Sequence, residues 1–383
     1  MSRCAKEPEM SKPAIRTFDE VYRGRAVVSL TRAISTREER NMSFIRLALL
    51  ATAAISVGVA TPAFAEIKIR VGTTVPEADN PQTHAFKAME EYIEFRSGGE
   101  MTVEVFYNGA LGGDRELLEQ VQQNTLQFTA VADGAVANFF PEIQVVAIPY
   151  LFSSSNHALT FFNTSPFFKD VKDRLEKETK LKVMLAAESG FRNITNNVKP
   201  IKAPADMAGL KMRTMESPVF MELMRSVGAA PTPIAFNETI LALRQGVVDG
   251  QENAVATVRM FGVWEVQKYM SINEHIYSPA LVTTSADFYN SLTDPQKQIF
   301  SDGIFVWASV SNSGYIANYA KDIEFMKSNG VEIYVNTADE KAAFKAAMQP
   351  PVLKFIAERV GQDKVDAFTA AVEETRKQLY GVQ

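Results

Sequence analysis

The residues best suited to chemistry in this sequence are two arginines and an asparagine that follow predicted strands. Arg192 comes shortly after the apolar run Leu181–Ala187, and Arg213 lies toward the end of the next strand. Asn253 follows a further predicted strand. In an open α/β sheet, ligands bind outside the carboxyl ends of the strands. A guanidinium fork binds a carboxylate through two parallel hydrogen bonds. We therefore expect these side chains to capture an organic anion.

The same residues also allow simpler interpretations. An arginine beside a strand often pairs with a surface acid, and Glu188 and Glu216 are available as partners. Asn253 comes just after Asp249-Gly250, a turn in which asparagine is common. Phe236 could equally belong to the hydrophobic core. Spacing alone leaves both interpretations open.

Familiar catalytic and nucleotide-binding motifs are absent from the sequence. There is no G-x-S-x-G elbow, no P-loop and no G-x-G-x-x-G. The three histidines, His84, His157 and His275, are far apart, and none has a metal-binding spacing. We therefore predict no cofactor, no metal site and no enzyme activity. A secreted α/β enzyme stays the alternative, because a nucleophile and its base can come from distant parts of a chain.

Alternating strands and helices would position these side chains. Strands are expected at 67–72, 101–107, 127–131, 181–187, 210–215 and 247–250. Helices are expected at 84–96, from Asp114, at 204–208, 238–245 and 294–328, and twice within 338–380. This alternation predicts an α/β fold with a parallel sheet covered by helices on both faces. The helix that starts at Asp294 is long enough to bridge two lobes.

Composition and charge exclude several other classes of protein. The chain has 383 residues with 40 Lys+Arg and 45 Asp+Glu, a net charge of −5. That length suggests about two domains of ~150 residues. The lack of a basic excess argues against nucleic-acid binding, which needs a positive surface. The only cysteine is Cys4, so a disulfide framework and a thiolate zinc site are excluded.

An export signal is predicted near the start of the chain. Residues 47–60 form an uncharged apolar run, preceded by Arg46 and followed by Ala63-Phe64-Ala65. The run is shorter than the ~20 residues of a membrane span, and its flanks are those of a secretory signal peptide. We assign 42–65 as a Sec-type signal peptide and 1–41 as an upstream extension outside the mature protein.

The predicted mature chain differs in charge from the full sequence. Residues 1–65 hold 10 basic and 6 acidic residues, so the remainder, with 30 basic and 39 acidic residues, has a net charge of −9. The mature chain would be an acidic protein without cysteine in the periplasm. Any anion that it binds must therefore be held by local arginines.

Short motifs spread along the chain carry a family resemblance. They are Leu111-Gly-Gly-Asp-Arg-Glu-Leu-Leu-Glu-Gln120, Ile148-Pro-Tyr-Leu-Phe152, Gly190-Phe-Arg-Asn-Ile-Thr-Asn196, Gly209-Leu-Lys-Met-Arg213, Pro231-Thr-Pro-Ile-Ala-Phe236, Gly246-Val-Val-Asp-Gly-Gln-Glu-Asn253 and Glu265-Val-Gln-Lys-Tyr269. In this order and spacing the chain resembles a periplasmic solute-binding protein of a tripartite ATP-independent periplasmic (TRAP) transporter, of the DctP type.

The resemblance implies an architecture and a set of partners. It implies the two-lobed α/β periplasmic binding protein fold, with a ligand cleft between the lobes and a long helix spanning both. We expect lobe I to comprise 66–189 and 279–318, and lobe II 190–278 and 319–383. It further implies lobe closure on the ligand and delivery to a permease with a small and a large membrane subunit. We expect a monomer with no nucleic-acid partner. A sensory role, with a membrane receptor as partner, would use the same pocket.

The resemblance also implies ligand-binding residues. Arg213 matches the arginine that makes the main carboxylate contact, and Arg192 matches a second arginine. Asn253 matches the asparagine that supports the same carboxylate, and Phe236 matches an aromatic residue that packs on the ligand.

Other positions match places in the family that tune the rest of the ligand. They are Thr74, Asp133, Glu188, Glu216 and His275. Sialic-acid-binding members read E-S-A-R where this chain reads Ala132-Asp-Gly-Ala135, which argues against sialic acid. The missing arginine also disfavours a second ligand carboxylate. The expected ligand is a hydroxylated monocarboxylate such as a sugar acid or uronate, with a C4-dicarboxylate or 2-oxo acid next.

Overall fold

The computed structural model describes residues 66–381. The predicted signal peptide at 42–65 and the upstream extension at 1–41 lie outside the described residues. Within 66–381, the predicted first strand and the long helix at 294–328 are both confirmed.

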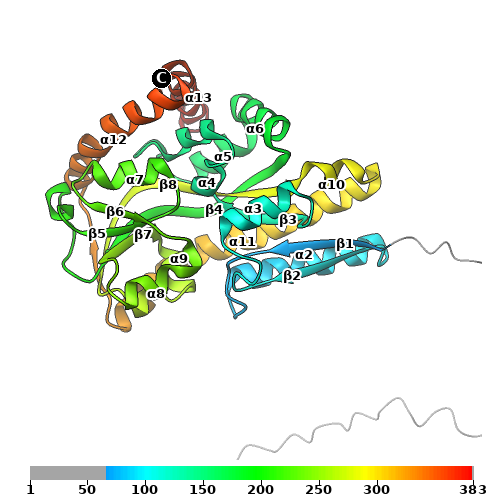
Figure 1. The fold of residues 1–383 in the computed structure, drawn as a ribbon, viewed down its shortest axis with the longest axis horizontal. Helices are drawn as coiled ribbons and strands as arrows, with labels where there is room; N and C mark the ends of the chain where they lie inside the picture. Colours follow the sequence, from blue (N-terminus) through cyan, green and yellow to red (C-terminus); the bar gives the residue numbers. More distant parts are fainter. Residues whose placement is uncertain (1–65, 382–383) are drawn as a thin grey trace, which may run out of the picture. The chain divides into compact units, whose positions relative to one another are not determined.

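A single mixed sheet runs through the described region (Figure 1). Its order is β2-β1-β3-β8-β4-β7-β5-β6, and β9 pairs with β8. The strands are β1 Ile67–Gly72, β2 Met101–Phe106, β3 Phe128–Ala132, β4 Leu181–Asn196, β5 Lys211–Thr214, β6 Ala230–Pro233, β7 Gly250–Ala254, β8 Tyr269–Ser285 and β9 Glu332–Val335. The two long central strands, β4 and β8, join the two ends of the sheet.

The expectation of a parallel sheet is wrong at the centre of the molecule. The pairs β1–β2, β1–β3, β5–β6 and β5–β7 are parallel, but β3–β8, β4–β8 and β4–β7 are antiparallel. Two of these antiparallel pairs arise from β8, a 17-residue strand that the sequence pattern did not predict and that enters between β3 and β4 in the reverse direction. The third arises because β7 also runs opposite to β4.

Two glycines explain local features of β4 and β7, the strands that carry Arg192 and Asn253. β4 changes register between Ala187 and Gly190, and Gly190 has φ 110°, a backbone conformation that favours glycine. The strand predicted at 247–250 is shifted, because β7 starts at Gly250. A Cβ on Gly250 would lie 2.2 Å from the Thr195 carbonyl oxygen, so the close approach of β4 requires glycine there.

The helices mostly follow the predicted pattern. They are α2 Pro81–Ser97, α3 Asp114–Gln122, α4 Asp133–Val136, α5 Ser155–Thr164, α6 Pro166–Thr179, α7 Pro218–Arg225, α8 Thr239–Arg244, α9 Val255–Met260, α10 Ala286–Ser291, α11 Asp294–Ser328, α12 Ala338–Val360 and α13 Gln362–Tyr380. Short 3₁₀ turns cover Pro141–Ala147, Pro204–Met207, Phe236–Glu238 and Val263–Glu265. α2 begins before the predicted 84, because the Asn80 side chain caps the amides of Gln82 and Thr83.

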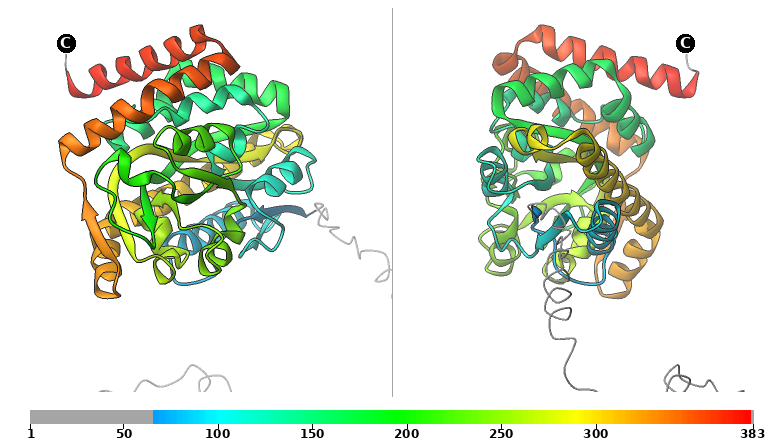
Figure 2. Two further views of the ribbon diagram at one scale, coloured as in Figure 1. Left: turned by 60° about the vertical axis from the view of Figure 1, so that its left-hand side comes forward. Right: turned by 90° about the vertical axis from the view of Figure 1, so that its right-hand side faces the viewer.

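Helices cover both faces of the central strands. α5, α6 and α12 contact β4 or β8, and α12 and α13 lie side by side (Figure 2). α11 and α9 also pack on β4, and α11 continues onto α2 and β9. α11 therefore contacts elements of both predicted lobes, which fits the predicted two-lobed α/β fold. The lobe boundaries themselves stay a prediction.

The packing of α11 on α2 and β3 is aromatic. The Trp307 ring lies 5.6 Å from that of Phe86 and 5.8 Å from that of Phe128, and all three are buried. Such pairs stabilise packing by about 0.5–1.5 kcal/mol beyond area burial. Among the described residues, no helix is both long and apolar enough to cross a membrane.

Candidate ligand-binding site

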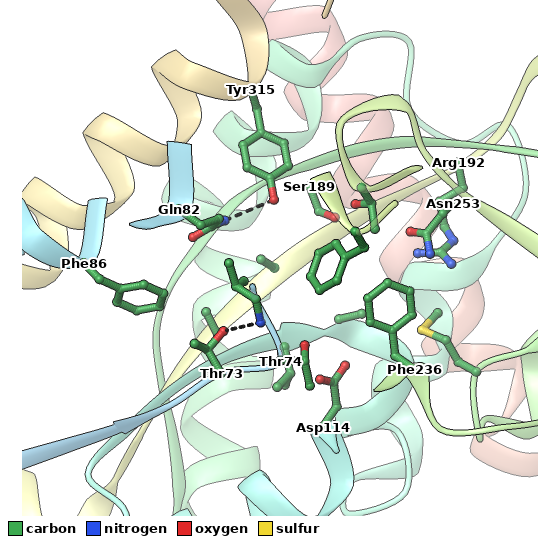
Figure 3. Close-up of a pocket in the computed structure, with 18 of the residues that line it drawn as sticks. Thr73, Thr74, Gln82, Phe86, Asp114, Ser189, Arg192, Phe236, Asn253 and Tyr315 are labelled. Atoms are coloured by element: carbon green, nitrogen blue, oxygen red, sulfur yellow. Dashed lines mark hydrogen bonds between the residues drawn. The ribbon is translucent and has the colours of Figure 1, made fainter. Parts of the chain in front are cut away.

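A cavity opens between β1, α3, the central strands and α11. The empty space within it is about 700 Å³, a figure that includes open solvent at its mouth. Five of the predicted site residues line it: Thr74, Arg192, Arg213, Phe236 and Asn253. In Figure 3, Arg192 and Asn253 lie together on one side, with Phe236 beside them, and Gln82 and Tyr315 lie on the other.

Arg213 is the least satisfied charge in this cavity. Its side chain extends from β5 and is 1% exposed. Nε donates to the Ile234 carbonyl at 2.8 Å, and the guanidinium lies 5.4 Å from the Phe236 ring centre. Nη1 is buried without a hydrogen-bond partner, and Arg213 takes part in none of the ion pairs between described residues. Burial and the nearby charge of Arg192 lower its pKa to about 10, although Glu252, Asp114 and Glu216 oppose the shift, so it remains charged at neutral pH.

Arg192 lines the same cavity but is already paired. Glu252 on β7 lies opposite Ile194 in the β4–β7 register, within reach of Arg192 on the neighbouring strand. Arg192 Nε and Nη2 bind the two Glu252 carboxylate oxygens, the latter at 2.8 Å, and Nη2 also donates to the Glu252 carbonyl at 2.7 Å. This is the bidentate geometry that arginine forms with carboxylates.

Asn253 and Phe236 complete the arginine side of the cavity. Asn253 is buried at the end of β7, and its amide donates to Gln251 Oε1 at 3.2 Å. Phe236 is half-buried and packs edge-on against Phe261, with ring centres 4.6 Å apart. The aromatic ring thus covers the Arg213 guanidinium from one side, which favours the cation and limits its access to water.

Asp114 is a lining residue that the sequence reasoning did not select. It was expected only to cap a helix, and it is the first residue of α3. Burial raises its pKa to about 6, although Arg213 and the Thr74 hydroxyl oppose the shift. The signal was present, since Asp114 stands inside the quoted motif Leu111–Gln120.

Two predicted residues lie beside the cavity rather than in it. Glu216 is exposed and borders an adjoining hollow with Asp114 and Arg213. Glu188 lines a second cavity, and its carboxylate accepts hydrogen bonds from Ser155 Oγ and Tyr277 Oη, both at 2.8 Å. Burial raises the pKa of Glu188, while these hydrogen bonds lower it.

Two further predicted residues lie behind the cavity wall. Asp133 is buried and accepts a hydrogen bond from Ser278, and burial raises its pKa to about 6. His275 is also buried, with Nε2 3.3 Å from Glu252 Oε2 and Nδ1 3.0 Å from Asn273 Oδ1. Neither side chain lines the cavity, and each is held by a hydrogen-bonded partner, Asp133 at the start of α4 and His275 within β8.

The wall opposite the arginines carries no charge and combines polar side chains with the aromatic rings of Phe86 and Trp307. Gln82 Nε2 donates to Ser311 Oγ at 3.0 Å and to Tyr315 Oη at 3.2 Å, which ties α2 to α11. Gln82 Oε1 and Trp307 Nε1 are buried without hydrogen-bond partners. Sequence reasoning missed these residues, since Gln82 and Tyr315 are more than 230 positions apart.

The described residues include no group of three or more His, Cys, Asp or Glu side chains placed to hold a metal ion. The charged residues that line the cavity are Asp114, Arg192 and Arg213. The arrangement can thus bind an anion by hydrogen bonds and charge at one end, and neutral polar groups at the other.

Comparison with known proteins adds to this geometry. A solute-binding protein from Verminephrobacter eiseniae is 33% identical over 293 residues, covering 76% of this chain and 86% of the relative. A TRAP solute-binding protein structure from Bordetella bronchispeptica, with density interpreted as pantoate, is 32% identical with TM-score 0.73 and covers 80% of this chain and 99% of that one. A TRAP solute-binding protein structure from Polaromonas sp. JS666, bound to D-erythronate, is 30% identical with a TM-score of 0.74. It covers 80% of this chain and 99% of that one.

The family assignment rests on most of the chain. Residues 71–359 match the DctP family, described as bacterial extracellular solute-binding protein, family 7. The members of this family bind substrates for transport and are not enzymes. The chain therefore belongs to the DctP family and is a solute-binding protein of the TRAP transporter type.

Proposed function

We propose that this protein captures a carboxylate-bearing organic acid in the periplasm, closes its two lobes on it, and delivers it to a TRAP membrane permease. The observation that supports this most directly is Arg213, a buried guanidinium with an unpaired Nη1 at the wall of the cavity. A buried charge without a partner is costly, and a ligand carboxylate would remove that cost.

In this proposal Arg213 makes the main contact with the carboxylate. Asn253 and the remaining face of Arg192 support the same group, Phe236 packs on the ligand, and Thr74 lies next to it. These five residues come from separate strands and loops that meet at the cavity. Asp133, Glu188, Glu216 and His275 shape the surroundings without direct contact, since their side chains lie outside the cavity lining.

The favoured ligand is a hydroxylated monocarboxylate such as a sugar acid or a uronate. The far wall offers uncharged donors and acceptors, among them Gln82, Thr73, Ser189 and Tyr315, which suit hydroxyl groups. Related structures contain D-erythronate and density interpreted as pantoate, both hydroxylated monocarboxylates. A C4-dicarboxylate or 2-oxo acid is next, and a Bacillus subtilis relative is named as a C4-dicarboxylate-binding protein.

The route to the site of action is part of the proposal. A Sec-type signal peptide at 42–65 would export a monomeric protein that starts at Glu66. Lobe I would comprise 66–189 and 279–318, and lobe II 190–278 and 319–383. The change of register at Gly190 lies on this boundary, and it is one place where β4 can bend as the lobes close.

The test is ligand binding by wild type and by Arg213→Ala. A thermal-shift panel of aldonates, uronates, dicarboxylates and 2-oxo acids identifies the ligand, because a ligand at 100 times its Kd stabilises by about 2.7 kcal/mol. Isothermal titration then compares the variants, and Arg213→Ala is expected to lose about 2–5 kcal/mol of binding free energy.

Lys211→Ala is the matched control, because Lys211 is an exposed cation on the same strand as Arg213. It should bind as wild type does. Equal affinity of Arg213→Ala and wild type for the best ligand would refute the proposed anchor. Recovery of chemically altered ligand after long incubation would contradict a binding function.

A further inference from the structure

We infer that Gln82 and Trp307 select ligands that carry a hydroxyl group remote from the carboxylate, because together they present one unused hydrogen-bond acceptor and one unused donor. This inference rests on the proposed function and specifies the ligand class of the same cavity. Both residues line the cavity, and Gln82 lies across it from Arg192 and Asn253 (Figure 3). Neither stands in the short motifs that carry the family resemblance.

The unused groups are Gln82 Oε1 and Trp307 Nε1. Both atoms are buried, and neither has a hydrogen-bond partner among residues 66–381. Gln82 is 5% exposed and Trp307 is 0% exposed, so water has little access to replace the missing partners. A polar group that is buried and unpaired destabilises a protein. A ligand group that bonds to both atoms would remove this cost.

The rest of the Gln82 amide is already held in place. Nε2 donates to Ser311 Oγ at 3.0 Å and to Tyr315 Oη at 3.2 Å, which uses both of its hydrogens. Beside this amide, α2 and α11 approach so closely that a Cβ on Gly314 would lie 2.4 Å from the Pro81 Cβ. The acceptor Oε1 is therefore the part of the amide that remains for a ligand, and its position is fixed by the packing of two helices.

Helix geometry places the acceptor and the donor about one turn apart. Gln82 precedes Phe86 by four residues on α2, and Trp307 precedes Ser311 by four residues on α11. The Gln82 amide meets Ser311, and the Phe86 ring lies 5.6 Å from the Trp307 ring, so the amide lies one turn from the indole. One turn rises about 5.4 Å. A hydroxyl that bonds to both atoms at about 2.8 Å spans a similar distance.

A hydroxyl is the ligand group that fits this pair, because it donates one hydrogen bond and accepts another. It would donate to Gln82 Oε1 and accept from Trp307 Nε1. A methyl or methylene group leaves both atoms unpaired. A second carboxylate only accepts, so it would satisfy the indole but leave the amide oxygen facing another oxygen without a proton.

Two alternatives lead to different ligand preferences. If the unpaired atoms are only a cost of packing α2 on α11, the loss of a ligand hydroxyl opposite them has no effect. If the Gln82 amide is reversed, Ser311 and Tyr315 donate to Oε1, and Nε2 becomes a second donor beside Trp307 Nε1. Two donors would favour a group that only accepts, such as a second carboxylate.

The first experiment varies the ligand. The reference is the aldonate that stabilises the wild type most in the thermal-shift panel. Isothermal titration at pH 7.5 compares it with its monodeoxy analogues and with the aldarate of the same carbon chain, whose far end is a second carboxylate. We expect an analogue that lacks a hydroxyl remote from the carboxylate to bind about 25-fold more weakly, about fivefold for each of two hydrogen bonds.

Two results with wild type would overturn the inference. One is that every monodeoxy analogue binds within about threefold of the aldonate, as packing without a binding role predicts. The other is that the aldarate binds more tightly than the aldonate, as the reversed amide predicts. A best ligand without any hydroxyl, such as succinate, would also overturn it.

The second experiment varies the protein, with the analogue that wild type rejects most. Gln82→Met and Trp307→Phe each remove one hydrogen bond to the ligand hydroxyl, so each should reduce the preference for the aldonate by about fivefold. The double variant should bind the two ligands within about threefold of each other. A purely structural role predicts equal losses for both ligands, so an unchanged preference in both single variants would overturn the inference.

Gln144→Met and Trp264→Phe are the matched controls. Gln144 is also buried with an Oε1 that has no partner among residues 66–381, but it lies outside the cavity lining, as does Trp264. Neither control should change the ligand preference. If Gln82→Met does not fold, Trp307→Phe and the wild-type series decide the question. Loss of binding in Arg213→Ala together with an unchanged preference in Gln82→Met and Trp307→Phe would reject this inference and leave the proposed function standing.

Discussion

Arg213 and Arg192 are the same residue type in the same cavity, and both are almost fully buried. Arg192 has its counter-ion, Glu252, on the neighbouring strand. Arg213 has a main-chain carbonyl on Nε and an unpaired Nη1. The difference teaches that burial of a charge does not by itself mark a ligand contact. In our proposal the mark of a ligand contact is unfilled hydrogen-bonding capacity, which Arg213 has at Nη1, whereas Arg192 is already paired within the protein.

The largest expected effect concerns the stability of the protein without ligand. Arg192→Ala leaves the buried Glu252 carboxylate without its guanidinium partner, so the free energy of unfolding should fall by about 3–5 kcal/mol. Arg213→Ala removes a buried charge that forms no salt bridge, although Asp114 and Glu216 attract it from nearby, so stability should change much less. Urea denaturation of both variants without ligand checks this contrast. Equal losses of stability in the two variants would show that the two arginines are not distinguished by their partners.

The next effect concerns how Arg213 binds. Arg213→Lys keeps the positive charge but loses the planar fork, so ligand affinity should fall by about 1–3 kcal/mol. The unliganded variant should unfold at the same urea concentration as wild type. Isothermal titration with the best ligand of the panel measures the loss. Unchanged affinity would mean that charge alone, without bidentate geometry, holds the carboxylate.

The smallest effect concerns the acid next to Arg213. The pKa of Asp114 is raised to about 6, so Asp114 is ionised at pH 7.5 and protonated at pH 5. A ligand carboxylate with a pKa below about 4 stays charged over this window. Protonation removes a repulsive charge, so affinity should rise about two- to fivefold as pH falls from 7.5 to 5, which is below ~1 kcal/mol.

Asp114→Asn should abolish this pH dependence. Asp133→Asn is the control, because Asp133 also has a pKa raised to about 6 but lies behind the wall. If the dependence of ligand affinity on pH persisted in Asp114→Asn and vanished in Asp133→Asn, the effect would belong to Asp133 and the prediction would be wrong.

Elements with a strong local pattern could be predicted from the sequence. β1 has alternating residues, and α11 has a helical pattern from Asp294 to Ser328, so both were placed correctly. The direction of the central strands could not be predicted, because it depends on where β8 enters the sheet. Strand order is a long-range property that local periodicity does not contain.

For the site, the sequence predicted several of the cavity residues but not how they pair with one another. Arg213, Arg192, Asn253, Phe236 and Thr74 reach the cavity, and the motifs around the first four already suggested it. The pairing of Arg192 with a glutamate 60 positions away needs the β4–β7 register, so no sequence pattern gave it.

The predicted site residues that do not line the cavity, and the lining residues that were not predicted, show the same limit of sequence reasoning. Asp133 follows β3 and His275 lies within β8, but their hydrogen bonds to Ser278 and Asn273 hold both side chains outside the cavity lining. Gln82 and Tyr315 contribute to the wall only because α2 packs on α11.

The place of Trp307 has a practical consequence. The full sequence has two tryptophans, and Trp307 lines the cavity while Trp264 packs against Phe325, with ring centres 5.1 Å apart, outside the lining. The Trp307 indole N–H has no hydrogen-bond partner among the described residues, and the ring borders the cavity. Its fluorescence emission should therefore respond to a change of polarity inside the cavity. The protein thereby carries its own optical reporter of occupancy, and replacing Trp264 with phenylalanine would isolate that signal without touching the cavity.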